Sequence, residues 1–318
     1  MRYVLRADAS LLIGAGHVMR SSAIAEELIL RGEEVIFIGV ISELPWVEER
    51  IRSLGFFGIY DNPNSFKSNP ASDVLIIDSY EIPLDDSFIA EENWFHVISI
   101  VDELTPNYLS TLRIHPGLDS NWTGNSKSPI LAGPKFIPLR SSLLSITSDN
   151  PPVDRKLKIV VVAGGTDPYN LVQKIAEVLS LFSESFNAYL FSNSLSIKAL
   201  DSRFKHFKTG SNLDEVSKDA DLVLTTSSSS SLEFIARGLC VGVACAVENQ
   251  KQYYESLSQL KIAAKIGFRS QTLGWQLDME KIRELVTIPD FREKLTKNAS
   301  GLIDFHGASR IVDAITAL

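Results

Sequence analysis

The sequence is poor in the residues from which metal sites and disulfide scaffolds are built. Its 318 residues include only two cysteines and five histidines. Cys240 and Cys245 lie in one apolar run without a C-x-x-C spacing, and neither H-x-x-x-H nor H-E-x-x-H occurs. We therefore expect two buried free thiols, no metal site and no organic cofactor.

Long apolar runs and an excess of basic residues are also missing. No run reaches the roughly 18 residues that span a bilayer, and charges interrupt the first apolar stretch, which is unlike a signal peptide. The 31 Lys and Arg against 39 Asp and Glu give a net charge of −8, which disfavours nucleic-acid binding. We predict a cytoplasmic protein without membrane insertion; the sequence leaves its oligomeric state open.

Two further motifs are absent, G-x-S-x-G and G-x-x-x-x-G-K-[ST]. Their absence argues against a serine-hydrolase elbow and a P-loop kinase. The composition itself is that of a folded globular protein, with 45% hydrophobic and 22% charged residues. A chain of this length can form one large domain, but we expect two of about 150 residues, each with its own core.

Short apolar runs alternate with helical patterns along the first half. Strands are predicted at residues 3–7, 34–40, 73–78, 96–101 and 111–114, and helices at 17–30, 43–53 and 85–91. Residues 119–134 and 145–152 are rich in Gly, Pro, Ser and Asn, and a double proline suits a linker. The boundary is predicted at 145–155, which gives domains 1–150 and 151–318.

The second half repeats the same order of elements. Strands are predicted at residues 158–163, 188–191, 221–225 and 240–247, and helices at 168–181, 194–201, 212–219, 227–237, 250–260, 274–286, 290–299 and 306–317. The last helix could pack back on the first domain. Two consecutive βαβα halves predict two doubly wound, Rossmann-like α/β domains, with ligands in the cleft between them.

The first candidate site segment joins the first strand to the first helix. It reads Gly14-Ala15-Gly16-His17, which is not a full dinucleotide fingerprint because the third small residue is missing. Glycines let a backbone approach a ligand, and a helix N-terminus favours an anion. His17 in the first helical turn could accept a proton. The alternative is a histidine that only closes the turn.

Two strand-to-helix turns of the second half suit a nucleotide. Gly164-Gly165-Thr166-Asp167 could approach a phosphate or ribose, or be a tight turn with Asp167 as the helix cap and Pro168 at the first helical position. The run from Thr225 through Ser231 could bind a diphosphate with hydroxyls and helix N–H groups. Glu233, one turn later, could accept both hydroxyls of a ribose.

A fourth segment, Glu248-Asn249-Gln250, ends the strand predicted at 240–247. Its amides suit sugar hydroxyls or acetamido groups, with helix capping as the alternative. Of the remaining histidines, His96 lies in a predicted strand and His206 in a charged surface stretch. His115 ends a strand and could face the cleft.

Taken together, these segments resemble the nucleotide-sugar hydrolase family of pseudaminic acid biosynthesis, which is grouped with spore-coat polysaccharide proteins. That family is a small relative of the peptidoglycan N-acetylglucosamine transferase and has the GT-B fold. The resemblance is carried, in order, by residues 6–10, 13–17, Arg20, 76–78, Tyr80, Asp102, Arg140, 164–167, Asn170, the serine run with Glu233, and 248–250.

The resemblance implies inverting, metal-independent hydrolysis of UDP-2,4-diacetamido-2,4,6-trideoxy-β-L-altropyranose to UDP and the free sugar. It assigns His17 and Tyr80 to catalysis, on the first domain. UDP would be held by the second domain, through the serine turn and its glutamate, and the Asn-Gln pair would face the sugar. The implied substrate-binding residues are Gly14, Gly16, Arg20, Asp78, Arg140, Gly164, Gly165, Thr166, Ser227, Ser228, Ser229, Ser230, Glu233, Glu248, Asn249 and Gln250.

The chain also departs from the family pattern, which keeps alternatives open. Ser79 stands where the family has a histidine, and Arg113 to Gly117 replaces its usual segment. These residues could line an acceptor pocket, so a GT-B glycosyltransferase that builds a cell-surface polysaccharide or flagellin glycan is the alternative. A non-catalytic nucleotide-sugar binding protein is a third reading. The exact sugar and base are not given by the sequence.

Overall fold

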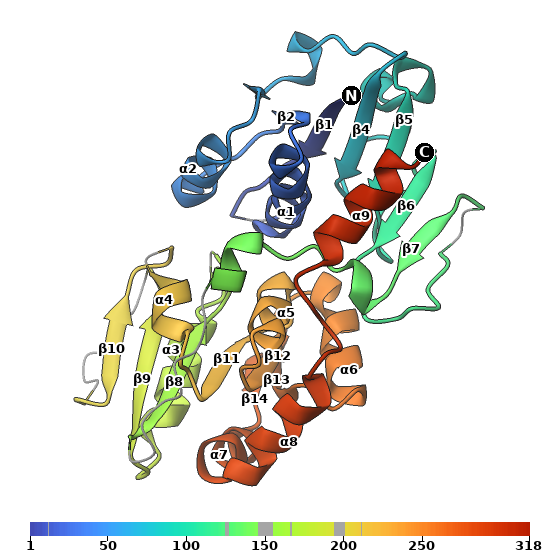
Figure 1. Cartoon of the computed structure of the whole chain (residues 1–318). Helices are drawn as coiled ribbons and strands as arrows, with labels where there is room; N and C mark the ends of the chain where they lie inside the picture. The colour runs from blue at the N-terminus through green and yellow to red at the C-terminus, as the bar shows by residue number, and fades with distance from the viewer. Residues whose placement is uncertain (12, 125–126, 146–154, 166, 194–200, 211) are drawn as a thin grey trace. The chain divides into compact units, whose positions relative to one another are not determined.

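The computed structural model describes residues 1–11, 13–124, 127–145, 155–165, 167–193, 201–210 and 212–318. The chain forms two compact units, each built on a seven-stranded sheet (Figure 1). Unit 1 is Met1–Ser141 with Asp304–Leu318, and unit 2 is Ser142–Ile303. The linker predicted at 145–155 falls mostly on residues 146–154, which lie outside the described residues.

The unit 1 sheet is parallel throughout, with the order β3-β2-β1-β4-β5-β6-β7. Its strands are β1 (Arg2–Ala7), β2 (Glu34–Ile38), β3 (Gly58–Tyr60), β4 (Asp73–Asp78), β5 (His96–Ile100), β6 (Leu112–His115) and β7 (Ile130–Ala132). Its helices are α1 (Gly16–Leu30), α2 (Pro45–Ser53) and α9 (Gly307–Thr316).

Short 3₁₀ turns complete unit 1 and the segment that leaves it. They are η1 (Pro63–Ser65), η2 (Ser87–Ile89), η3 (Glu91–Asn93), η4 (Pro134–Phe136) and η5 (Ser141–Ser145). The helix predicted at 85–91 is thus wrong in type, because the structure has two 3₁₀ turns there.

The unit 2 sheet has the order β10-β9-β8-β11-β12-β13-β14, and only the pairing of β13 with β14 is antiparallel among its described strands. Its strands are β8 (Leu157–Val162), β9 (Phe186–Phe191), β10 (Phe204–Phe207), β11 (Leu222–Thr226), β12 (Val241–Cys245), β13 (Ala264–Ser270) and β14 (Gly274–Leu277). Its helices are α3 (Leu171–Ser180), α4 (Leu213–Ser217), α5 (Ser229–Ala236), α6 (Lys251–Gln259), α7 (Met279–Thr287) and α8 (Pro289–Ala299), with the 3₁₀ turn η6 (Glu248–Gln250).

Central strands are buried on both faces, which is why they read as continuous apolar runs. Every residue of β4 is buried, and β4 packs between β1 and β5. The strand orders of the two sheets, with helices between their strands, confirm the predicted doubly wound α/β class in both units. Cys240 is buried and Cys245 half-buried, and both are free thiols. Burial raises the pKa of Cys240 to about 12.

The C-terminal helix α9 packs on unit 1 and lies beside α1, so both chain termini belong to this unit (Figure 1). Arg31 at the end of α1 pairs with Asp313 at 2.6 Å and donates to the Ser309 hydroxyl at 2.8 Å. A Cβ at Gly307 would lie 2.0 Å from the carbonyl oxygen of Ile137, so only glycine allows this close approach.

Several predicted helices begin later than expected. Helix α2 starts at Pro45, not 43, since Glu43 has a φ of 59°. Helix α3 starts at Leu171, not 168, because Asp167 and Asn170 have φ values of 43° and 56°. Asp167 is therefore not the residue that precedes the first helical one, although its carboxylate still accepts from the backbone of the first helical turn. Similarly, Asn212 precedes α4 with a φ of 42° and no side-chain cap.

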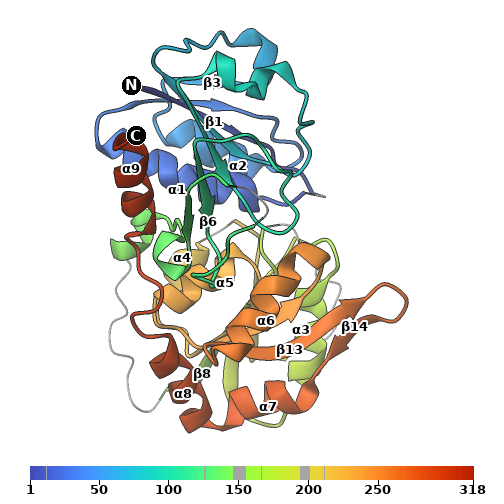
Figure 2. The same ribbon diagram turned by 90° about the vertical axis from the view of Figure 1, so that its right-hand side faces the viewer.

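The sequence pattern does not predict the short edge strands or one hairpin. Strands β3 and β7 have three residues each, and β10 exposes two of its four. The β13–β14 hairpin (Figure 2) contradicts the start of the helix predicted at 274–286, which begins at Met279 after the Asp278 cap. His206 lies in β10, where its Nε2 donates to the Ser192 carbonyl. The helix predicted at 194–201 falls largely outside the described residues.

Candidate functional site

Each unit brings its candidate residues to the carboxyl ends of neighbouring strands where the strand order reverses. In unit 1 the first strand, β1, lies between β2 and β4; in unit 2 the first strand, β8, lies between β9 and β11. Ligands of open α/β sheets bind at such reversal points.

Helix α1 begins at Gly16, directly after the loop that leaves β1. Gly14 has a φ of 81°, and its N–H donates to the Ser10 carbonyl at 2.8 Å. A Cβ at Gly14 or Gly16 would meet no atom within 4 Å, so this side of the loop is open. No side chain among the described residues caps the helix start, which leaves first-turn N–H groups available to a ligand.

Helical spacing places three polar side chains of α1 against the end of β4. His17, Arg20 and Ser21 are three and four residues apart and share one face of the helix. All three contact Asp78, the last residue of β4, which lies opposite Ala7 at the end of β1. Asp78 is fully buried and His17 is 5% exposed. The sequence thus assembles a buried polar cluster under the start of α1.

His17 and Asp78 form a directed pair. The two atoms, His17 Nδ1 and Asp78 Oδ1, are 2.5 Å apart. A carboxylate can only accept, so Nδ1 carries the proton and donates to Asp78, and Nε2 keeps its lone pair. Among the residues that the structure describes, none forms a hydrogen bond with Nε2. The free nitrogen of this ring is therefore the one able to take a proton from a ligand or a water molecule.

Arg20 fixes the charge of Asp78. Its Nε donates to Oδ2 and its Nη2 to Oδ1, both at 2.6 Å. Burial acts to raise the pKa of Asp78, but the Arg20 guanidinium outweighs this and lowers the pKa to about 2. Asp78 is thus ionised at neutral pH and orients His17. Since Arg20 is buried against Asp78, it supports the pair from within unit 1.

Tyr80 contacts the same imidazole from the other side. Its ring lies edge-on to His17, with centroids 4.4 Å apart, and its hydroxyl donates to Asp102 Oδ2 at 2.5 Å. Burial raises the pKa of Tyr80 far above its usual range, and the neighbouring Asp102 adds to the rise. Tyr80 therefore stays protonated, and His17 is the side chain of this pair that can act as a base.

Asp102 completes what we call the imidazole cluster, defined as His17, Arg20, Asp78, Tyr80 and Asp102. It follows β5 and lies 3.8 Å from Arg20 Nη2. The sequence resemblance includes Asp102 but assigns it no role. The available signal is positional, because Asp78 and Asp102 both come at the ends of adjacent parallel strands.

Two other polar residues of unit 1 were predicted to line an acceptor pocket, and their surroundings argue against it. Ser79 is 7% exposed, and its hydroxyl accepts from the Glu81 N–H. His115 is 1% exposed, its Nδ1 donates to the Val101 carbonyl, and its ring stacks on Trp122 at 4.2 Å. Both side chains are enclosed within their own unit, so the prediction that His115 faces a cleft is wrong.

The serine turn, residues 226–231, links β11 to α5 in unit 2. Ser228 precedes the helix, and its carbonyl accepts from the N–H and the hydroxyl of Ser231. The hydroxyls of Ser228 and Thr226 are 3.2 Å apart. Ser229 and Ser230 are half-buried in the first helical turn, and none of the described residues bonds their hydroxyls. These hydroxyls and the helix N-terminus suit an anion.

Gln250 adjoins the serine turn. The Ser227 hydroxyl donates to the Gln250 carbonyl at 3.1 Å, and the Gln250 side chain accepts from the Ala246 N–H at 2.9 Å. Glu248 and Asn249 are exposed beside it, with Glu248 paired to Lys251. The structure therefore brings the third and fourth candidate segments together.

The remaining predicted residues are spread over both units, and one of them lies outside the described residues. Gly164 has a φ of 62° and open space around it, and Gly165 is half-buried. Thr166 lies outside the described residues. Glu233 is half-buried in the helix that follows the serine turn, and Arg140 is half-buried near the end of unit 1.

Asp167, beside these glycines, is a buried carboxyl group. It accepts hydrogen bonds from the Leu171 and Val172 N–H groups at 2.7 and 3.2 Å. Burial outweighs these bonds and raises the pKa of Asp167 to about 6. Asp167 thus holds the start of α3 close to the Gly164 turn.

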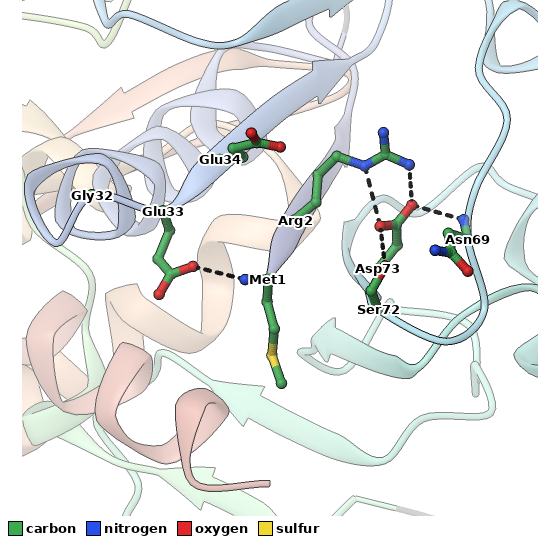
Figure 3. Close-up of a pocket in the computed structure, with 8 residues that line it drawn as sticks. All are labelled: Met1, Arg2, Gly32, Glu33, Glu34, Asn69, Ser72 and Asp73. Atoms are coloured by element: carbon green, nitrogen blue, oxygen red, sulfur yellow. Dashed lines mark hydrogen bonds and ion pairs between the residues drawn. The ribbon is translucent and has the colours of Figure 1, made fainter.

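A separate pocket of about 480 Å³ lies at the opposite edge of the unit 1 sheet, where β1, β2 and β4 begin (Figure 3). The Met1 ammonium pairs with Glu33 at 3.2 Å, and Arg2 pairs with Asp73. Asp73 also accepts from the Asn69 N–H at 2.8 Å. These mutual pairs give the pocket a structural role at the amino ends of the strands, away from the imidazole cluster.

Neither a metal site nor a membrane span emerges from the described residues. No group of three or more His, Cys, Asp or Glu there could hold a metal ion. In the same part of the chain, every helix is too short or too polar to cross a bilayer.

The two Rossmann-like units have the GT-B architecture, and solved glycosyltransferases share it. The glycotransferase of kitacinnamycin superposes with a TM-score of 0.69 at 14% identity, covering 99% of this chain and 98% of its own. Arabidopsis thaliana UGT89C1 in complex with UDP-L-rhamnose gives 0.68 at 14% identity, with the same coverage of 99% and 98%. The calicheamicin glycosyltransferase CalG4 gives 0.65 at 12% identity, covering 100% and 98%. The predicted GT-B fold is confirmed.

Two proteins are related in sequence, and no family model matches the chain. The uncharacterized protein MJ1062 of Methanocaldococcus jannaschii is 26% identical over 307 residues, which is 88% of this chain. This chain spans 62% of the length of that relative. The UDP-2,4-diacetamido-2,4,6-trideoxy-beta-L-altropyranose hydrolase of Campylobacter jejuni is 24% identical over 268 residues, covering 79% of this chain and 94% of the hydrolase.

Proposed function

We propose that this chain is an enzyme that hydrolyses a UDP-linked diacetamido-trideoxy sugar to UDP and the free sugar, with inversion at the anomeric carbon. The observation that carries the proposal is the His17–Asp78 pair at 2.5 Å, since it provides a base with one free nitrogen. The 24% identity with the Campylobacter jejuni hydrolase, over 79% of the chain, supports the substrate class. The role in pseudaminic acid biosynthesis is part of the same proposal.

The proposed reaction assigns the base to unit 1 and the diphosphate to unit 2. His17 Nε2 takes a proton from a water molecule as the water oxygen bonds to the anomeric carbon. The bond from that carbon to the diphosphate oxygen breaks, and its electron pair leaves with UDP. The serine turn would stabilise the growing charge on the diphosphate through helix N–H groups and the hydroxyls of Ser229 and Ser230.

The second candidate is a glycosyltransferase, the activity named for the solved structures that share the fold. It would use the same base to activate an acceptor hydroxyl in place of water. The burial of Ser79 and His115 favours water, because the residues from which an acceptor pocket was predicted are enclosed within unit 1.

The test is incubation with a panel of nucleotide sugars, without an acceptor, followed by NMR. We expect free sugar from the UDP-linked diacetamido compound, with the inverted anomer seen in the first minutes. His17→Asn is expected to lower kcat by about 100-fold or more, because positioned general bases contribute roughly 10²–10⁴.

The matched control is His206→Asn, a histidine on the edge strand β10 of unit 2, which we expect to leave the rate unchanged. Release of sugar only after an acceptor is added would favour the transferase. Binding of UDP with no turnover under either condition would contradict both enzymatic readings.

A further inference from the structure

The imidazole cluster holds more negative charge than its one guanidinium can balance. Arg20 is shared between two carboxylates, with Asp78 at 2.6 Å and Asp102 at 3.8 Å. With both carboxylates ionised and His17 neutral, the cluster carries one net negative charge. A proton on His17 would bring the net charge to zero.

The largest charge effects on the pKa values of Arg20, Asp78 and Tyr80 come from within the cluster itself. From the end of β1, Arg6 and Asp8 pair with each other at 2.6 Å and contribute no net charge. From α1 comes Arg20, and from the end of β4 come Asp78 and the protonated Tyr80. Asp102, from the end of β5, is therefore the residue that leaves the cluster negative.

Asp102 accepts hydrogen bonds from its own turn on one carboxylate oxygen and from the cluster on the other. Its Oδ1 accepts from the Leu104 N–H at 3.0 Å and the Thr105 hydroxyl at 3.2 Å. Its Oδ2 accepts from the Tyr80 hydroxyl, whose ring edge rests on His17. The turn after β5 therefore fixes Tyr80 against the imidazole through one carboxylate.

We propose that Asp102 is a positioning residue for the His17 base: it holds Tyr80 against the imidazole and supplies the second negative charge that favours the protonated ring. The inference rests on the proposed function, in which His17 takes a proton from the attacking water. Charge balance then favours that proton transfer, since the cluster becomes neutral as the bond to UDP breaks.

Asp102→Asn tests the charge while keeping an oxygen that can accept from Tyr80. We expect kcat to fall roughly tenfold, and the acidic limb of the kcat–pH profile to move to lower pH by roughly half a unit or more, because a nearby negative charge stabilises a cation. Asp102→Glu keeps the charge and is expected to restore the position of the limb. A uniform loss of kcat with an unmoved limb would overturn the proposal.

A second readout does not depend on turnover. In histidine-labelled protein, NMR follows the pH at which each imidazole titrates, and His17→Asn identifies the signal of His17. We expect this signal to titrate at lower pH in Asp102→Asn than in the wild type. If it moves in a protein that hydrolyses nothing, the proposed function fails and the role of Asp102 stands.

Tyr80→Phe separates positioning from charge and covers the case in which Asp102→Asn does not fold. Both carboxylates remain in this variant, so the His17 signal is expected to titrate close to its wild-type position while kcat falls several-fold. A shift to lower pH as large as half a unit in Tyr80→Phe would contradict the assignment of the charge effect to Asp102.

Discussion

The carboxyl ends of the two sheets share one topology but carry different side chains, charged in the cluster of unit 1 and neutral in the serine turn of unit 2. Both units place a glycine with positive φ after the first strand, Gly14 in unit 1 and Gly164 in unit 2. Unit 1 then buries a charged cluster under its first helix, whereas unit 2 presents hydroxyls and helix N–H groups at the serine turn. Topology thus fixes where a site can form, and the side chains fix what it can do.

The first way to sharpen this comparison is to remove a hydrogen-bonding side chain from each edge, an acceptor in unit 1 and a donor in unit 2. Asp78→Ala leaves Arg20 buried without its carboxylate, and we expect unit 1 to lose about 3–5 kcal/mol of stability. Ser227→Ala removes a neutral hydrogen bond and is expected to cost unit 2 about 1 kcal/mol.

Fluorescence can report on unit 1 alone, because Trp46, Trp94 and Trp122 lie in it and Trp275 lies in unit 2. The stability of unit 1 in Asp78→Ala is therefore measured by urea denaturation in a Trp275→Phe background. The stability of unit 2 in Ser227→Ala is measured by hydrogen exchange of unit 2 peptides. Equal losses of unfolding free energy in the two units would contradict the distinction between a charged edge and a neutral edge.

The second prediction concerns pH and unit 2. The folded pKa of Asp167, about 6, lies above its usual 3.8, so its stabilising contribution is complete below pH 3.8 and lost as pH rises through 6. Asp167→Asn cannot ionise at this position, so unit 2 of this variant should not lose stability over this range. The free energy of unfolding of unit 2 in the variant, relative to the wild type, should therefore rise by at most about 3 kcal/mol between pH 4 and pH 7. Hydrogen exchange of unit 2 peptides across this range measures the difference.

The stability of unit 1 is expected to change with pH in the opposite direction. The pKa of Asp78 is lowered to about 2, so its contribution is present above pH 3.8 and is lost as pH falls toward 2. A wild-type unit 1 whose stability holds steady between pH 4 and pH 2 would contradict the role given to Arg20.

The smallest expected effect tests what the two units share. Gly14→Ala and Gly164→Ala place a methyl group in open space at backbone φ values of 81° and 62°. Each substitution should therefore lower the free energy of unfolding by roughly 1 kcal/mol through backbone strain alone. Gly16→Ala, also in open space, is the control and should cost less. Thermal unfolding of the three variants checks this order, and a costly Gly16→Ala would show that space, not φ, limits the loop.

Sequence reasoning was most successful where burial dominates. Strand β4 was predicted with its observed bounds because both faces are buried, while β3 and β7 are three-residue edge strands with little apolar pattern. The late start of α3 depends on the left-handed Asp167 and Asn170, a backbone choice that residue types do not announce.

The candidate site divides in the same way. The resemblance names His17, Arg20 and Asp78 separately, and the structure joins His17 and Arg20 to Asp78 from one face of α1. The role of Asp102 depends on strand order and on a tyrosine that bridges two loops, which no local pattern encodes. His115 was misjudged because the loop after β6 folds Trp122 over it.

The proposed assignment of the base to unit 1 and of UDP binding to unit 2 is tested most directly by calorimetric titration of UDP into three proteins. These are the wild type, His17→Asn, and a double variant with Ser229→Ala and Ser230→Ala. We expect His17→Asn to bind UDP within about twofold of the wild type, and the serine variant to bind roughly fivefold or more weakly, at about 1 kcal/mol for a lost hydrogen bond. Strong loss in His17→Asn with none in the serine variant would contradict the account.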